Sequence, residues 1–161
     1  MIPPPVRFHS TAAFVADIER SKAFYTGLLG QEIDLDFGKN VILKSGLTLW
    51  EIQPNHIIPH TLGHEHIAEN RSTRFEFYFE SSALAEVYEH LLAAGVEFLH
   101  PVHEEPWGQR TIRFFDPDRH LIEVGEPLET FIARLFSDGM RPEEITVKTR
   151  VPVEKVRELI R

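Results

Sequence analysis

The sequence is expected to pass from a strand into a helix at Val15-Ala16-Asp17-Ile18-Glu19-Arg20-Ser21-Lys22-Ala23-Phe24-Tyr25, which Leu28-Leu29-Gly30 follows. Residues 8–16 form a short apolar segment bounded by charged residues, which predicts a strand. Asp17 is a suitable helix N-cap, although Arg20 stands where a glutamate would complete a capping box. Gly30 is expected to end the helix, whose apolar stripe consists of Ile18, Phe24, Leu28 and Leu29.

The same order of elements is predicted twice along the chain. Short strands are expected after the first helix at 32–37, 41–44 and 47–53, separated by glycine-containing turns. An aperiodic loop follows over 54–72. A second series is then expected: a strand at 74–80, a helix from Ser81 or Ser82 to 94, and strands at 96–100, 110–115 and 121–125. This repetition predicts an α+β fold of two βαβββ halves, about 6–53 and 74–126.

Composition narrows the classes of protein to which the chain can belong. Its 161 residues suit one domain with a short appendage, and twelve phenylalanines can fill a core or line a pocket. The absence of cysteine excludes disulfides, thiolate ligands and cysteine nucleophiles. A net charge of −8 argues against general affinity for nucleic acid or anionic lipid. The start Ile2-Pro3-Pro4-Pro5 is unlike a signal peptide and no apolar run is long enough to span a membrane, so we expect a cytoplasmic protein.

Residues 127–161 are predicted to form a C-terminal helical extension beyond a domain over 1–126. Leu128, Ile132 and Leu135 form one apolar stripe, and a second follows at Val153, Val156, Leu159 and Ile160. Residues 142–156 faintly resemble a helix-turn-helix and are locally basic. So short a segment cannot bury a core alone, so we expect it to pack on the main domain or on a second chain. Contact with DNA is the less expected alternative.

Two stretches resemble the vicinal oxygen chelate superfamily, which comprises glyoxalases, bleomycin-resistance proteins and extradiol dioxygenases. The first is the strand-to-helix passage over 15–30. The second runs from Pro106-Trp107-Gly108-Gln109-Arg110 through Phe115-Asp116-Pro117-Asp118 to Leu121-Ile122-Glu123-Val124. Arg119 stands where the family usually has a glycine, which implies a different turn or a modest strain. The resemblance covers roughly residues 6–126 and implies paired modules around a half-barrel cavity and a homodimer.

The resemblance also implies where a divalent metal would bind. Metal-using members take one ligand from the first and one from the last strand of each half. Glu51 and Glu123 match the last-strand positions, whereas the first-strand positions fall on Ser10, with His9 one residue away, and on Arg74. A one-residue offset turns a side chain to the other face of a strand unless a bulge absorbs it, and a guanidinium cannot bind a metal. Glu51, Glu123 and His9 are therefore the candidate ligands for zinc, nickel, iron or manganese.

A second metal candidate is the loop that contains His56, His60, His64 and His66. Histidines four residues apart can share an ion on one helical turn, but Pro59 and Gly63 interrupt such a helix. A solvated or dimer-contacting loop is the favoured alternative.

Without a metal, strand parity predicts which side chains would line the cavity. If Phe75, Phe77 and Phe79 pack on a helix, the alternate side chains face the cavity. The expected substrate-binding residues are then Arg74, Glu76, Tyr78, Arg113 and Trp107. These residues mix charge with aromatic surface, which suits a small polar or anionic molecule.

Three functions follow from these observations. The favoured one is a glyoxalase- or bleomycin-resistance-like protein that binds a small molecule, without the usual four-ligand metal site. The alternative is a metal-dependent lyase, isomerase or dioxygenase, with Glu51 and Glu123 as the catalytic residues. The third is a ligand-responsive regulator that uses the C-terminal helices.

Overall fold

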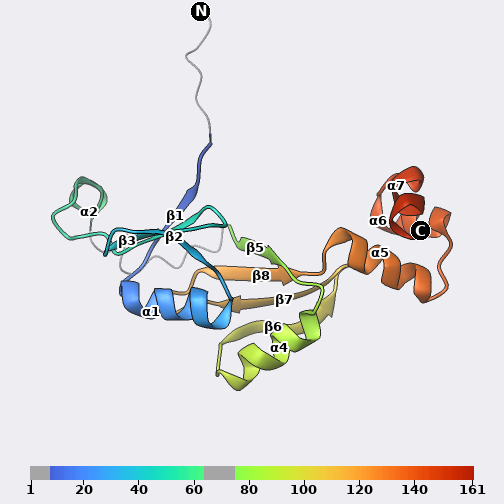
Figure 1. The fold of residues 1–161 in the computed structure, drawn as a ribbon, viewed down its shortest axis with the longest axis horizontal. Coiled ribbons are helices and arrows are strands. Elements are labelled where there is room, and N and C mark those ends of the chain that lie inside the picture. Colours follow the sequence, from blue (N-terminus) through green and yellow to red (C-terminus); the bar gives the residue numbers. More distant parts are fainter. Residues whose placement is uncertain (1–7, 64–74) are drawn as a thin grey trace, which may run out of the picture. The chain divides into compact units, whose positions relative to one another are not determined.

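The computed structural model describes residues 8–63 and 75–161, so the predictions on Arg74, His64 and His66 fall outside the described residues. The chain forms two compact units, Met1–Ser72 and Thr73–Arg161, and each is described by itself. Among the described residues, no helix combines the length and apolar character needed to cross a membrane. Figure 1 shows the elements of both units.

The first unit is a four-stranded sheet with the strand order β1-β4-β3-β2. β1 and β4 are parallel and the other neighbours are antiparallel. The strands are β1 (Thr11–Phe14), β2 (Ile33–Asp36), β3 (Asn40–Leu43) and β4 (Leu47–Trp50). The helical elements are α1 (Ile18–Lys22), its continuation η1 (Ala23–Leu28) and, in the loop before residue 63, α2 (Ile57–Leu62). Ala13, Val41 and Leu49 are buried on adjacent strands of this sheet, and α1 contacts β4.

The second unit repeats this topology with the strand order β5-β8-β7-β6. Its elements are β5 (Phe77–Glu80), α4 (Leu84–Ala93), β6 (Phe98–Glu104), β7 (Arg110–Phe115) and β8 (Leu121–Gly125). One face of the sheet packs on α4, because Tyr88 of the helix lies against Phe98, whose ring lies against Phe114. Leu91, Ile112 and Ile122 are fully buried. The repeated topology confirms the predicted α+β class of paired βαβββ modules.

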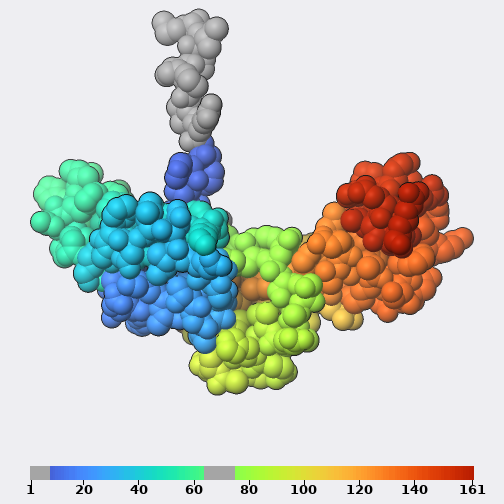
Figure 2. Space-filling model, viewed as in Figure 1, coloured from blue at the N-terminus to red at the C-terminus, as the bar shows by residue number. Residues whose placement is uncertain are grey.

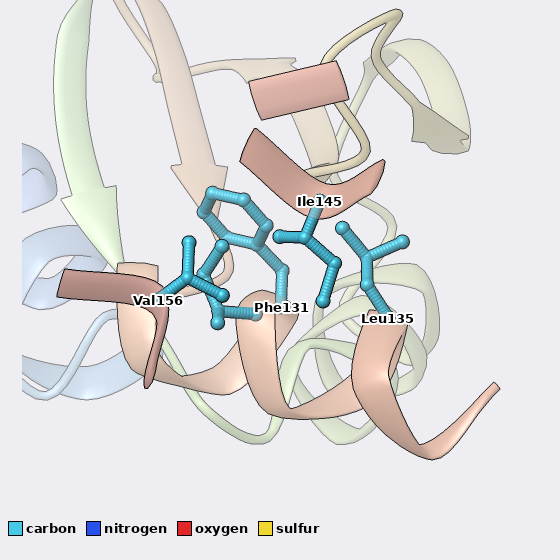
Figure 3. Packing of buried hydrophobic residues seen from close by; sticks show 5 residues of the cluster. Phe131, Leu135, Ile145 and Val156 are labelled. Atoms are coloured by element: carbon cyan, nitrogen blue, oxygen red, sulfur yellow. The ribbon is translucent and has the colours of Figure 1, made fainter. Parts of the chain in front are cut away.

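The extension also belongs to the second unit and contains three helices. They are α5 (Leu128–Ser137), α6 (Pro142–Thr149) and α7 (Val153–Leu159), coloured orange to red in Figures 1 and 2. One side-chain cluster joins all three helices, as Figure 3 shows for four of its labelled members: Phe131, Leu135, Ile145 and Val156. Pro142 begins α6, where a missing backbone N–H costs nothing, as predicted. The helices α6 and α7 therefore do not bury their apolar side chains alone but pack against α5.

Several local predictions differ from the structure. The first helix winds more widely from Ala23, and the backbone N–H of Leu29 reaches back to the carbonyl of Phe24. Apolar spacing over two turns does not distinguish the two windings. The second helix has Ala83 rather than a serine at its N-cap; the hydroxyl of Ser81 accepts from Ala83 N instead. Arg119 does adopt the left-handed conformation of a glycine, with φ 66°.

Candidate functional site

Four residues form a polar row across the second sheet. Tyr78 of β5 pairs with Glu123 of β8, Glu123 pairs with Arg113 of β7, and Arg113 pairs with His100 of β6. Residues that lie opposite each other on neighbouring strands point to the same face. The alternate residues, Phe77, Ile122 and Phe114, are buried on the face that α4 covers. The polar row therefore lies on the face turned away from α4.

The guanidinium of Arg113 is the centre of this face. It binds Glu76 through Nε at 2.9 Å and Glu105 through Nη1 at 2.8 Å, and it forms a third ion pair with Glu123. Nη1 also lies 3.4 Å from Nε2 of His100. The side chain of Glu123 is 5% exposed and that of Arg113 is 20% exposed. The structure thus joins three residues expected at the site, Glu76, Arg113 and Glu123, and adds Glu105 and His100.

Burial and neighbouring charge change the ionisation of these groups. Burial, followed by a hydrogen bond with Glu76, raises the pKa of Glu123 to about 7, although the charge of Arg113 opposes the rise. The pKa of Glu76 is lowered, because its bonds to Arg113 and Glu123 outweigh the effect of burial. Burial lowers the pKa of Arg113, but bonds to Glu76 and Glu105 and the charge of Glu123 raise it overall. Near neutral pH, Glu123 is the carboxyl that can give or take a proton.

A second network adjoins the row at Tyr78. The side-chain amide of Gln109 donates to Oη of Tyr78 and to the carbonyl of Glu126, both at 2.8 Å. The indole of Trp107 donates to Oε1 of Gln109 at 3.1 Å. Burial, and to a lesser degree Glu80, raises the pKa of Tyr78 to about 12, although the Gln109 bond opposes this. Tyr78 and Trp107 remain 47% and 41% exposed, so aromatic surface is available beside the charged row.

Gln109 was missed as a site residue, although it lies within the motif that carried the family resemblance. Its position between Trp107 and the strand gave no sign of its direction. The sequence feature that could have indicated this contact is Gly125, two residues after Glu123 in a strand otherwise rich in large residues. A Cβ at Gly125 would lie 2.7 Å from Nε2 of Gln109 and 3.0 Å from Oη of Tyr78. A glycine inside a strand often marks such a close approach.

Glu51 lies in a different environment in the first unit. Its carboxylate accepts from the backbone N–H of Ile18 at 2.8 Å and binds Nζ of Lys39 at 2.5 Å. The bond to Lys39, followed by the bond to Ile18, lowers the pKa of Glu51. Glu51 therefore binds the N-terminus of α1, where a negative charge is favourable.

Strand pairing explains why Glu51 and Glu123 differ. In the second sheet Glu123 lies opposite Tyr78 on the parallel neighbour, whereas in the first sheet Trp50 lies opposite Phe14. Glu51 follows one residue later, on the same parity as the fully buried Leu49. Trp50 instead contacts the rings of Phe14 and His56. The face of the first sheet that corresponds to the polar row thus carries Thr48 and Trp50 rather than Glu51.

The remaining candidates are histidines of the first unit. His9 is exposed and precedes β1. His56 is the N-cap of α2, and its Nδ1 accepts from the backbone N–H of Ile58 at 3.2 Å. His60 lies exposed within α2. In residues 8–63, the histidines therefore have capping or surface positions.

The side chains around Arg113 do not fit a divalent metal. Three carboxylates converge on a guanidinium, which has no lone pair for an ion and lies where an ion would have to bind. Across the two described ranges, no group of three His, Cys, Asp or Glu side chains could hold a metal. Zinc, nickel, iron or manganese bound by Glu51, Glu123 and His9 stays a prediction, and no reaction step is derived from it.

Comparison with known proteins agrees with this architecture. A family profile described as the glyoxalase-like domain matches residues 8–129. A protein of unknown function from Agrobacterium tumefaciens str. C58 is 36% identical, with a TM-score of 0.66, over 78% of this chain and 97% of that chain. A lactoylglutathione lyase from Agrobacterium tumefaciens is 26% identical, with a TM-score of 0.54, over 77% of this chain and 96% of that one.

A further similar structure is a glyoxalase/bleomycin resistance protein/dioxygenase from Nocardioides. It is 29% identical, with a TM-score of 0.57, over 80% of this chain and 87% of that one. Comparison with curated protein sequences gives no match. The chain belongs to the glyoxalase-like domain family of the vicinal oxygen chelate superfamily. The family predicted from the two motifs is therefore confirmed.

Proposed function

We propose that this protein binds a small polar organic molecule on the face of the second sheet that carries the polar row, without a metal. The observation that carries this proposal is the placement of Arg113 between Glu76 and Glu123, on the face that α4 leaves uncovered. If these ion pairs only stabilised the fold, there would be no need for half-exposed aromatic side chains next to them. Here Tyr78 and Trp107 are both half-exposed, and aromatic walls with a few fixed polar groups are typical of ligand sites.

The charges favour a polar ligand over an anionic one. Arg113 already serves the three carboxylates of Glu76, Glu105 and Glu123. An anion would have to displace one of these carboxylates and would then meet the other two. A neutral or basic molecule can instead donate to the carboxylates and stack on the exposed rings. Glu123, with a pKa of about 7, can act as donor or acceptor toward it.

Binding titrations with two probes test the proposal. Bleomycin is basic and lactoylglutathione is acidic, and each occurs in the name of a similar protein, from Nocardioides and Agrobacterium tumefaciens respectively. We expect bleomycin, and basic members of a fragment library, to raise the melting temperature of the parent protein and to bind more tightly than lactoylglutathione. Glu123→Gln and Glu76→Gln should weaken binding at least about tenfold, because each removes a carboxylate that a basic ligand would contact, and a hydrogen bond to a charged group is worth about 1.5–3 kcal/mol.

Control variants distinguish this site from other surfaces. Arg157→Met removes an exposed ion pair with Glu143 in the extension and should leave binding unchanged. A probe that binds the Glu76 and Glu123 variants as tightly as the parent would place the site elsewhere. Failure of every basic or neutral probe, together with tight binding of an acidic one, would contradict the assigned ligand class. The expected homodimer remains a prediction, which light scattering in solution can test.

A further inference from the structure

We propose that the C-terminal extension is part of the binding site, because Arg134 fixes the turn that carries Trp107 and Gln109. Arg134 is thus a positioning residue: it contacts no expected ligand, but acts through the turn over residues 104–109. The link to binding rests on the proposed function, because it requires a ligand beside the polar row. The structural link itself can be tested without any ligand.

Arg134 joins α5 to both ends of the turn. Its Nε and Nη2 bind the two carboxylate oxygens of Glu126 at 3.1 and 2.8 Å. Nη2 also donates to the carbonyl of Gly108 at 2.6 Å, and Nη1 lies 3.3 Å from Glu104. The side chain of Arg134 is 16% exposed and that of Glu126 is 8% exposed. A planar guanidinium with several fixed donors can hold these groups together, as a lysine ammonium cannot.

The contacts continue from Arg134 to the polar row. The carboxylate that Arg134 binds also accepts from the backbone N–H of Arg110 at 2.9 Å. The carbonyl of Glu126 accepts from Gln109, whose amide donates to Tyr78. Trp107 donates to the same Gln109 side chain. Each of these polar groups therefore has its direction set by a neighbour, in an unbroken series from α5 to Tyr78.

Direct packing supports the same link. Gly108 has a φ of +95°, and a Cβ there would lie 2.7 Å from Cε of Lys148 and 3.0 Å from Cδ1 of Leu135. Both side chains belong to the extension, and Nζ of Lys148 lies 3.4 Å from Glu104. The extension therefore contacts the turn through apolar, ionic and hydrogen-bonded groups together.

The extension lies largely outside the region shared with the family. The family match ends at residue 129, five residues before Arg134. The similar structure from Agrobacterium tumefaciens str. C58 is covered over 97% of its length by only 78% of this chain. Positioning of the turn by Arg134 is thus a feature added to the shared domain.

Four basic residues of the extension favour this role over binding to DNA. Arg141, Lys148 and Arg157 each contact a carboxylate, at Glu144, Glu104 and Glu143. Lys155 pairs with Glu158. Cations that bind phosphate must be available to it, whereas these four already have acidic partners.

The test uses the full chain without ligand and follows the two tryptophan indoles by ¹H–¹⁵N NMR. Trp107 lies in the turn, and Trp50 lies in the first unit and serves as an internal control. We expect Arg134→Ala to shift the Trp107 indole signal and to accelerate exchange of the Gln109 side-chain amide at least about tenfold. The Trp50 signal should stay in place. Arg134→Lys should restore these signals only in part.

Arg157→Ala provides the matched control, because it removes an arginine–glutamate pair from the same extension without touching the turn. An unchanged Trp107 signal in Arg134→Ala would overturn the proposal, and so would an equal change in Arg157→Ala. Because these readouts need no ligand, their failure is separate from a failure of bleomycin to bind. If bleomycin binds the parent, Arg134→Ala should weaken that binding and Arg157→Ala should not.

Discussion

Arg113 and Glu123 lie directly opposite each other on β7 and β8, and an ion pair joins their side chains. The pair is mostly buried, and one arginine serves two further carboxylates. A charge left alone in such a place is destabilising, so the first consequences concern stability as well as binding.

Arg113→Met should lower the free energy of unfolding by about 3 kcal/mol at pH 8, because Glu76, Glu105 and Glu123 would lose the cation that they share. Adding Glu123→Gln to this variant should recover at least about 1 kcal/mol, since it removes one of three acidic groups left close together without a cation. Urea denaturation of the parent, both single variants and the double variant measures this coupling. Arg157→Met, at an exposed pair, should change stability by less than about 1 kcal/mol; an equally small effect of Arg113→Met would refute the argument.

Glu123→Gln should also flatten the dependence of stability on pH. Burial raises the folded-state pKa of Glu123 from 4.5 to about 7. A raised pKa means that the contribution is fully present below about pH 4.5 and is lost as pH rises through about 7. The parent should therefore lose about 2 kcal/mol from this group between pH 5 and pH 8, and the variant should not. Denaturation at these two pH values compares them, and parallel losses in both proteins would show that Glu123 is not responsible.

Gly125→Ala should separate Gln109 from Tyr78, because the added Cβ would lie 2.7 Å from the Gln109 amide. We expect a loss of about 1–3 kcal/mol from this overpacking. Gly27→Ala is the matched control, since no atom lies within 4 Å of its added Cβ and it lies in the helical segment η1. That control should be neutral or stabilising by up to about 1 kcal/mol in thermal unfolding. The same loss in both variants would argue against a specific contact at Gly125.

Arg119→Ala and Arg119→Gly separate backbone strain from side-chain contacts. Arg119 has φ 66°, binds Glu97 at 2.6 Å and lies over the ring of Phe115. Alanine keeps the unfavourable backbone and loses both contacts, so it should destabilise the protein by about 1 kcal/mol. Glycine loses the same contacts but relieves the strain, so Arg119→Gly should be the more stable of the two by about 1 kcal/mol. Equal melting temperatures would mean that the turn is unstrained.

Elemental analysis should find far less than one zinc, nickel, iron or manganese ion per purified chain. The physical reason is the guanidinium of Arg113, which lies among the carboxylates that an ion would need. Treatment with a chelator should leave the melting temperature unchanged. A stoichiometric metal that is lost in both Glu51→Ala and Glu123→Ala would instead support the metal-dependent enzyme.

The sequence predicted the second half better than the first. In β8, apolar residues on both sides of Glu123 placed its carboxylate on the face opposite Ile122 and Val124, and the structure agrees. In β4 the similar sequence around Glu51 suggested the same direction, yet Glu51 lies beyond the last paired residue and binds the start of α1. The difference of one residue depends on strand register, which tertiary packing sets and a single sequence does not reveal.

The other gaps have a similar cause. Glu105 and Gln109 lie at the ends of a turn, where alternation stops and side-chain direction follows from local backbone angles. Their partners, Arg113 and Tyr78, are distant in sequence or on another strand. Arg134 was predicted only as part of a helical tail, because the sequence around it does not indicate that its side chain binds the carbonyl of Gly108.

The small core of α5, α6 and α7 has a consequence for how such a chain can be built. Because Phe131, Ile145 and Val156 bury one another, the extension has an apolar interior of its own. Its contacts with the shared domain include those of Arg134, Leu135 and Lys148 at the turn around Gly108. Substitutions in the extension could therefore change the position of the turn while the sheets of the shared domain keep their sequence.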